Sequence, residues 1–378
     1  MKPVVIAGYK RSPFHFAHKG QLVKKRPDDL AADVVRGLIE SSGIDPAGIE
    51  DLIMGCAFPE GEQGFNVARI VGLLSDLPIS VAGVTVNRFC GSSMQSIHFA
   101  AGAIQMNAGD AFICAGVESM SRIPMGGYNP MPNADLYEKN EGAYMAMGET
   151  AENLAQKYQI PREEQEQLAV SSHAKATAAR EEGRLAGEIV AVECEGETID
   201  QDGCIRPGTS ADVLSTLDPA FDADGSVTAG TSSPLTDGAA AVLVCTEEFA
   251  KSNSLQPLAL LKSIAVAGVP PEIMGIGPVA ATEKALTRAG LKLDDIDVIE
   301  LNEAFAVQAL SCCRELTIDQ ARMNIDGGAL ALGHPLGATG ARITGKAAQI
   351  LKREGKRYAL STQCIGGGQG ISTILEAA

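Results

Sequence analysis

One cysteine stands where an apolar run gives way to small residues. Residues 84–95 read VTVNRFCGSSMQ, and Cys90 comes just before a stretch with helical character. A helix N-terminus stabilises a thiolate through the helix dipole, and a nearby imidazole would lower the pKa of the thiol further. A small buried thiol in a turn, the commoner role of an intracellular cysteine, fits the same residues. Cys90 is therefore a candidate nucleophile with a structural alternative.

Three later stretches also place a reactive side chain beside small residues, which let a ligand approach the backbone closely. His334, between glycine and proline, could polarise a thiol or donate to an oxyanion, or be purely structural. Cys364 could transfer protons beside glycine amides that line an oxyanion pocket, although glycine runs are often only tight turns. Asn302 could bind water or cap a strand, and Glu303 could be a base or anchor a loop. The three stretches are NEAFA (302–306), GHPLGATG (333–340) and CIGGGQG (364–370).

The elements around these residues repeat along the chain. Residues 43–58 and 290–305 align without a gap as a glycine that ends a helix, an acidic turn and a short apolar strand. Asp28 and Asp29 are predicted to cap the first of these helices. Farther on, strand-like residues 84–87 and 323–326 lead to Cys90 and to His334, each before a helix, and then to a second strand at 111–117 and at 358–362. A duplicated α/β unit would bring such loops together across a pseudo-two-fold axis.

The middle of the chain, from about residue 121 to 234, has a different texture, with a polar helical run near residues 149–182. It reads as an insertion that either covers a substrate or serves packing and oligomerisation. The predicted units are 1–119 plus 237–257, the inserted 120–236, and 258–378.

The bulk composition excludes several classes of function. A net charge of −16 opposes binding to nucleic acid or to anionic membranes, although a local basic pocket for an anionic ligand stays open. The chain has no apolar run long enough for a signal peptide or a membrane span. Its nine cysteines form no CxxC pair, so neither a zinc site nor a disulfide framework is expected. These features predict a soluble cytoplasmic protein with reduced thiols and no metal.

The four stretches, in this order, resemble the thiolase family, which comprises acyl-CoA acetyltransferases and 3-ketoacyl-CoA thiolases. The resemblance extends over essentially the whole chain through VVIAGYKRSPF at the start, GFNVAR (64–69), MGETAEN (147–153) and GTSSPLTDGAAA (230–241). It implies an α/β thiolase fold, with two duplicated halves stacked in αβαβα layers and a large inserted loop domain. The opening GYKRSP and a short stretch at 193–210 depart from the family pattern. The short stretch leaves the shape of the acyl pocket, and hence the acyl chain length, open.

The resemblance implies a role for each candidate. Cys90 would accept the acyl group, His334 would activate it, and Cys364 would be the acid and base. Asn302 would bind a water that stabilises an enolate, and the amides of Cys90 and Gly366 would receive the thioester oxygen. Residues expected to contact coenzyme A, which is a substrate, are Ser233, Met147 and Met274, the two methionines being equally compatible with packing. No cofactor is implied.

The implied reaction is CoA-dependent cleavage of 3-ketoacyl-CoA to acetyl-CoA and a shortened acyl-CoA, as in fatty-acid β-oxidation. The alternative within the family is a biosynthetic acetoacetyl-CoA thiolase (acetyl-CoA C-acetyltransferase). Outside it, the rivals are a decarboxylating condensing enzyme, which pairs cysteine with His-His or His-Asn, and an inactive CoA-binding protein. The family also implies a homodimer or homotetramer, and a partner in a β-oxidation complex stays open.

Overall fold

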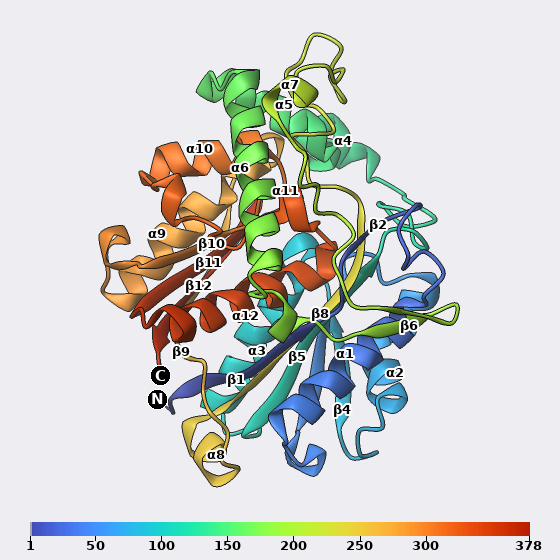
Figure 1. The fold of residues 1–378 in the computed structure, drawn as a ribbon, viewed down its shortest axis with the longest axis vertical. Helices are drawn as coiled ribbons and strands as arrows, with labels where there is room; N and C mark the ends of the chain where they lie inside the picture. Colours follow the sequence, from blue (N-terminus) through green and yellow to red (C-terminus); the bar gives the residue numbers. More distant parts are fainter. Residues whose placement is uncertain (1) are drawn as a thin grey trace.

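The computed structural model describes residues 2–378 and folds them into two α/β halves that face each other across a pair of helices (Figure 1). The strand order is β1–β8–β5–β3–β4 in the first half and β9–β12–β11–β10 in the second. A short antiparallel pairing of β1 with β9 joins the two sheets. The strands are β1 (Val4–Arg11), β3 (Asp51–Gly55), β4 (Ala82–Val86), β5 (Ala111–Ser119), β8 (Thr236–Thr246), β9 (Ala259–Gly268), β10 (Val298–Leu301), β11 (Tyr358–Ile365) and β12 (Gln369–Ala377), with the short β2 (His15–Phe16) beside β8.

Helices form the remaining layers. In the middle, α3 (Ser92–Gln105) and α12 (Leu336–Glu354) pack on each other, and α12 contacts strands of both halves. Helices α1 (Pro27–Ser42) and α2 (Val67–Leu74) cover the outer face of the first sheet, while α9 (Gly277–Ala289) and α10 (Ala306–Leu316) lie outside the second (Figure 1). The short helices α8 (Glu247–Ser252) and α11 (Ala329–Leu332) complete the two halves. The predicted αβαβα layering is confirmed.

The central strands are apolar on both faces because helices cover both faces. Along β5, alternate side chains from Ala111 to Val117 enter the core beneath α1 and α2, whereas Phe112 and Cys114 enter the core around the middle helices. This arrangement explains why such strands read as continuous apolar runs rather than as alternating patterns. The middle helices are therefore enclosed by protein on nearly every side.

The repeat predicted from the sequence has a matching local structure in both halves. Gly43 and Gly290 end α1 and α9 in the left-handed conformation, with φ of +69° and +68°, which glycine adopts without steric cost. Two expectations were wrong in detail. Asp28 lies in the first turn of α1 rather than capping it, because the helix begins at Pro27. Residues 323–326 form no strand: only a bridge from Met323 to Ile299 stands where β4 lies in the first half.

The insertion contains two long helices rather than one, because Pro161 interrupts the polar helical run. Buried ion pairs attach it to the halves: Arg11 of β1 binds Asp202 through two nitrogens at 2.6 and 2.8 Å, and Glu188 accepts from Arg11 at 2.7 Å and from Lys346 of α12 at 2.9 Å. Its elements are α4 (Ala134–Lys139), α5 (Met147–Tyr158), α6 (Arg162–Glu181), β6 (Val192–Cys194), β7 (Glu197–Ile199) and α7 (Ala211–Leu214) (Figure 1).

The chain returns from the insertion through β8, which lies between β1 and β5 in the first sheet. The exact boundaries of the three units stay a prediction. None of the helices in residues 2–378 has the length and apolar character needed to cross a membrane.

Candidate active site

Cys90 lies in a single helical turn, Phe89–Gly91, that leads directly into α3. Phe89 has a φ of +43°, a conformation that non-glycine residues rarely adopt and that is often found at functional sites. Hydrogen bonds within the turn stabilise it: the amide of Arg88 donates to Oγ of Ser92 at 2.9 Å, and that hydroxyl donates to the carbonyl of Phe89 at 2.6 Å. The predicted position before a helix is confirmed, and Ser92 is part of the protein's own bonding rather than open space for a ligand.

Two backbone amides, those of Gly366 and of Cys90 itself, donate toward the Cys90 sulfur. They are the pair that the sequence resemblance assigns to a thioester oxygen. Their effect on the thiol is outweighed by burial, which raises the pKa of Cys90 to about 11, with a smaller contribution in the same direction from Glu118. The expectation of a lowered pKa from the helix dipole is therefore wrong: the free thiol is protonated near neutral pH, because its desolvation exceeds the stabilisation by the two amides.

The hydrogen bonds of His334 assign its tautomer. Thr339 donates its hydroxyl proton to the carbonyl of Pro335 at 3.0 Å, so its oxygen accepts from Nδ1 of His334 at 2.6 Å. Nε2 is then unprotonated and accepts from Nδ2 of Asn302 at 3.4 Å. Burial, followed by the charge of Arg342, lowers the pKa of His334 to about 3. The imidazole is thus neutral, and Nε2, whose one contact is the long bond from Asn302, is the nitrogen that can take a proton.

Asn302 directly follows β10, the strand parallel to β11, which carries Cys364. Its backbone amide donates to the carbonyl of Thr362 at 3.0 Å, which fixes the start of the loop. Its side-chain Oδ1 is buried and has no hydrogen-bond partner among residues 2–378. Buried polar atoms are seldom left without a partner, so this oxygen is an acceptor available to water or to a substrate group.

Cys364 is buried near the end of β11, opposite Gly370 of β12. Burial raises the pKa of its thiol well above the usual value, and the charge of Cys90 raises it further, because the two thiols lie close together. Gly366 follows in the loop, where a Cβ added to it would meet the Met147 sulfur at 3.5 Å and the Phe89 ring at 3.7 Å. The loop of the second half therefore lies against the Cys90 turn of the first.

An apolar cluster surrounds the nucleophile. Phe58 and Cys90 pack against four buried apolar residues, including Leu336, which comes two residues after His334. The rings of Phe58 and Phe89 lie 6.0 Å apart at their centroids. This surface is suited to an acyl chain bound at the sulfur, because it excludes water and has few polar groups. The buried residues of the cluster are Ala17, Ala57, Met120 and Leu336.

The three residues expected to contact CoA lie in different surroundings. Met147 begins α5 and is partly buried beside Gly366. Ser233 is partly exposed, and its backbone amide donates to the carbonyl of Ala304 at 2.9 Å, within the loop that starts at Asn302. Met274 is only 3% exposed and belongs to the core of the second half, so in this conformation it makes packing contacts.

Two residues near the site could not be assigned a single role from the sequence: Thr339 had none, and Glu303 had two alternatives. Thr339 belongs to the quoted GHPLGATG stretch, and its spacing of five from His334 on the first turn of α12 was the available signal. Glu303 accepts hydrogen bonds from Ser172 at 2.7 Å, Asn324 at 2.7 Å and the amide of Leu330 at 3.2 Å. Three donors on one buried carboxylate fit the loop-anchoring interpretation of Glu303 rather than that of a base.

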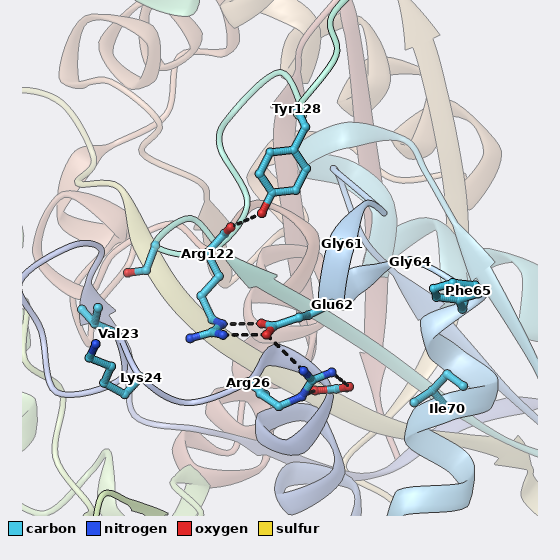
Figure 2. Close-up of a pocket in the computed structure, with 12 residues that line it drawn as sticks. Val23, Lys24, Arg26, Gly61, Glu62, Gly64, Phe65, Ile70, Arg122 and Tyr128 are labelled. Atoms are coloured by element: carbon cyan, nitrogen blue, oxygen red, sulfur yellow. Dashed lines mark hydrogen bonds and ion pairs between the residues drawn. The ribbon is translucent and has the colours of Figure 1, made fainter.

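A cavity of about 620 Å³ lies elsewhere, between the segment that precedes α1 and residues 121–128. Figure 2 shows its centre, where Glu62 pairs with Arg122 and with Arg26. None of the predicted site residues lines this cavity. Its size favours a binding site, but Arg26, Asp28, Glu62 and Arg122 are already paired with one another. The two reactive thiols, Cys90 and Cys364, lie outside its lining.

Several known proteins resemble this chain over its whole length. A 3-ketoacyl-CoA thiolase from Bacillus subtilis is 48% identical over 389 aligned residues, with 100% of both chains covered. The structure of human mitochondrial 3-ketoacyl-CoA thiolase in complex with CoA superimposes with a TM-score of 0.92 at 37% identity, covering 100% of this chain and 98% of the human one. Bacillus anthracis acetyl-CoA acetyltransferase gives the same TM-score and identity, with 100% and 99% coverage.

The family descriptions divide the chain where the two halves meet. Residues 4–248 match "Thiolase, N-terminal domain", and residues 255–377 match "Thiolase, C-terminal domain". Together with the relatives, these matches cover nearly the whole chain: the protein belongs to the thiolase family.

Proposed function

We propose that this protein is a 3-ketoacyl-CoA thiolase that cleaves 3-ketoacyl-CoA with CoA through an acyl group on Cys90. The observation that carries the proposal is that Cys90 and Cys364 lie close together, with backbone amides from opposite halves, those of Cys90 and Gly366, directed at the Cys90 sulfur. The neutral imidazole of His334, bonded to Asn302, comes two residues before Leu336, which packs with Cys90. The name shared by the relatives supports the same reaction. The apolar cluster around Cys90 supports an acyl substrate.

In the first step, the Cys90 sulfur attacks the 3-keto carbon as Nε2 of His334 takes the thiol proton. Because both groups are neutral beforehand, the charge pair forms only as the reaction proceeds. The C2–C3 bond then breaks, its electron pair passes to the enolate of acetyl-CoA, and Cys364 protonates C2. Asn302, through a bound water and together with His334, stabilises the enolate oxygen.

In the second step, the Cys364 thiolate takes the proton of an incoming CoA thiol, and the CoA sulfur attacks the thioester carbon on Cys90. The amides of Cys90 and Gly366 stabilise the oxyanion that forms there. Collapse of the intermediate releases the shortened acyl-CoA, and His334 returns to the Cys90 sulfur the proton that it took in the first step, which restores the thiol and the neutral imidazole. We assign CoA contacts to Ser233, which lies against the loop that starts at Asn302, and to Met147, which lies beside Gly366. We assign a third to Met274, which would have to leave the core beside α5 to make it.

Thiolysis of a series of 3-ketoacyl-CoAs tests the subtype. Faster cleavage of medium or long chains is expected for the degradative enzyme, and strict preference for acetoacetyl-CoA would instead support the biosynthetic alternative, to which the Bacillus anthracis structure gives weight. A decarboxylating condensing enzyme would act on malonyl thioesters and fail with free CoA. An inactive CoA-binding protein would give no acyl transfer with any substrate.

Intact-protein mass spectrometry tests the roles of the thiols. Cys90→Ala should form no acyl-enzyme, whereas Cys364→Ala should lose carbon–carbon cleavage and still accept an acyl group slowly from a simple acyl-CoA. An acyl group on Cys364 of the wild type would contradict the assignment.

We further propose that the protein is a homodimer or homotetramer and acts in the cytoplasm in fatty-acid β-oxidation. Strand β4 supports association, because it is an edge strand without charged residues and with Val84 42% exposed. All nine cysteines are free, which supports a reducing compartment. Sedimentation of the purified protein tests the association, and a monomer at micromolar concentration would contradict it.

A further inference from the structure

The residue before Cys364 reaches the other half of the molecule. Gln363 lies on β11, and its side-chain amide donates to the backbone carbonyl of Cys90. The side chain is fully buried. The contact joins residues 273 positions apart, Cys90 itself and the residue that precedes Cys364. It is a direct polar link between the Cys364 strand and the Cys90 turn.

Strand β11 fixes the backbone from which the Gln363 side chain extends. Gln363 pairs with Ile371 in the antiparallel ladder of β11 and β12, and the residues before and after it pair with β12 as well. The next side chain on the same face, Ile365, packs with Met94 of α3. It also lies so near Gly91 that an added Cβ there would approach it to 2.6 Å. The Cys90 turn is thus pressed onto the same face of the strand from which Gln363 donates.

The side-chain oxygen of Gln363 argues against a merely structural role for this residue. Oε1 of Gln363 is buried and has no partner among residues 2–378. A buried amide with an unpaired oxygen is less favourable than an apolar side chain of the same size. Packing alone would therefore be served better by methionine or leucine, and the donation to Cys90 is the one interaction that the amide adds.

The carbonyl that receives the bond belongs to the nucleophile itself. The sulfur and the amide of Cys90 are attached to the same Cα as this carbonyl, so a rotation of the turn would displace both from Gly366. The preceding residue, Phe89, is in the left-handed region and favours such a rearrangement. A bond to the carbonyl opposes it.

We propose that Gln363 is a positioning residue for the nucleophile: it fixes the Cys90 turn so that the sulfur stays on the two amides while the acyl group is gained and lost. This inference deepens the proposed function and rests on acyl transfer at Cys90. Gln363 itself touches no substrate. It acts through the peptide of Cys90.

The test compares three variants with the wild type. Gln363→Met preserves the size of the side chain and removes the donor, and Ser361→Ala is the matched control, because Ser361 is buried on the same face of β11 and its bond goes to Thr344 at 3.1 Å. Thiolysis should lose at least about tenfold in kcat in Gln363→Met with KM changed less than about twofold, since small misplacements of a reacting group lower the rate steeply. Ser361→Ala should keep kcat within about twofold.

Gln363→Glu adds a readout that packing would not produce. A buried protonated carboxyl can donate to the Cys90 carbonyl, and an ionised one repels it. Relative to the wild type, the kcat of Gln363→Glu should therefore fall as the pH rises, whereas the ratio for Gln363→Met should be independent of pH. A pH-independent ratio for Gln363→Glu, or wild-type kcat in a folded Gln363→Met, overturns the inference.

The alkylation rate of Cys90 by iodoacetamide separates the inference from the proposed function. If the wild type cleaves no 3-ketoacyl-CoA, the proposed function fails, and an alkylation rate in Gln363→Met equal to that of the wild type overturns the positioning role as well. A changed rate, with Ser361→Ala unchanged, supports it. If Gln363→Met does not fold, the pH comparison of Gln363→Glu decides.

Discussion

His334 donates its Nδ1 proton to the hydroxyl of Thr339 at 2.6 Å, and this bond leaves Nε2 as the acceptor of the imidazole. The relationship is local, because both residues belong to the loop and first turn that begin α12. A neutral histidine with its proton in the wrong place cannot act as a base at Nε2. Thr339 therefore controls which nitrogen takes the thiol proton.

Replacing Thr339 by valine preserves the shape of the side chain and removes this control. We expect kcat for thiolysis to fall by about 10²-fold, the lower end of what a general base contributes. Thr339→Ser, which keeps the hydroxyl, should recover most of the rate. Steady-state kinetics of the two variants check this, and equal rates for valine and wild type would contradict it.

The alkylation rate of Cys90 in the free protein should depend steeply on pH. Burial raises the pKa of this thiol to about 11 and lowers that of His334 to about 3, so no thiolate–imidazolium pair is present at neutral pH. Because the thiolate is the nucleophile, the rate with iodoacetamide should rise about tenfold per pH unit between pH 6 and 9. A plateau near pH 7, read by mass spectrometry of the Cys90 peptide, would contradict the neutral pair.

His98 should make the protein sensitive to acid. It is buried on α3, where its Nε2 contacts Oγ1 of Thr373 at 2.8 Å, and burial, followed by Arg88 and Arg288, lowers its pKa to about 3. The unfolded chain takes up this proton near pH 6.5, so the stabilisation is complete above that pH and is lost toward pH 3. The loss amounts to about 1.4 kcal/mol per pH unit.

Urea unfolding of wild type and His98→Gln at pH 7.5, 6 and 5 isolates this contribution, because the other titrating groups are common to both proteins. The difference in unfolding free energy between the two should shrink as the pH falls. Parallel curves would contradict the buried neutral histidine.

Glu303→Gln should weaken the fold and leave the chemistry unchanged. The substitution places an NH₂ group where donors now point, at a cost of about 1–3 kcal/mol for an unsatisfied buried group. The pH profile of kcat should not change, since Glu303 anchors a loop. Glu283→Gln, on the exposed face of α9, is the control for stability. A lost limb of the pH profile would instead make Glu303 a base.

Local features of the fold could be predicted from the sequence because their causes are local. The glycines that end α1 and α9, the apolar strands and the helices after Cys90 and His334 follow from residue type and spacing. The missing strand at residues 323–326 could not be predicted, because Asn324 has a φ of +48° and its side chain, rather than the backbone of a strand, makes the hydrogen bonds to Leu301. Met323 is left with a single bridge.

For the site, the identity of the reactive residues was predictable and their ionisation was not. The helix dipole at Cys90 is visible in the sequence, but the pKa depends on how much protein encloses the sulfur, which only the packing of both halves determines. The bond from Gln363 is equally invisible, because nothing in a strand sequence says which backbone lies beneath it. Met274 shows the opposite case, in which the sequence suggested a ligand contact and the structure shows a buried residue. A methionine in a ligand tunnel and a methionine in a core look the same in a sequence.

The contact between the middle helices, α3 and α12, has a consequence for when the active site forms during translation. At Gly340 of α12, an added Cβ would lie 2.2 Å from the backbone nitrogen of Met94 in α3, so the two helices touch backbone to backbone. Helix α3 is synthesised long before α12. A chain still on the ribosome thus carries Cys90 without its base, and acquires a reactive centre only when nearly the whole polypeptide has emerged.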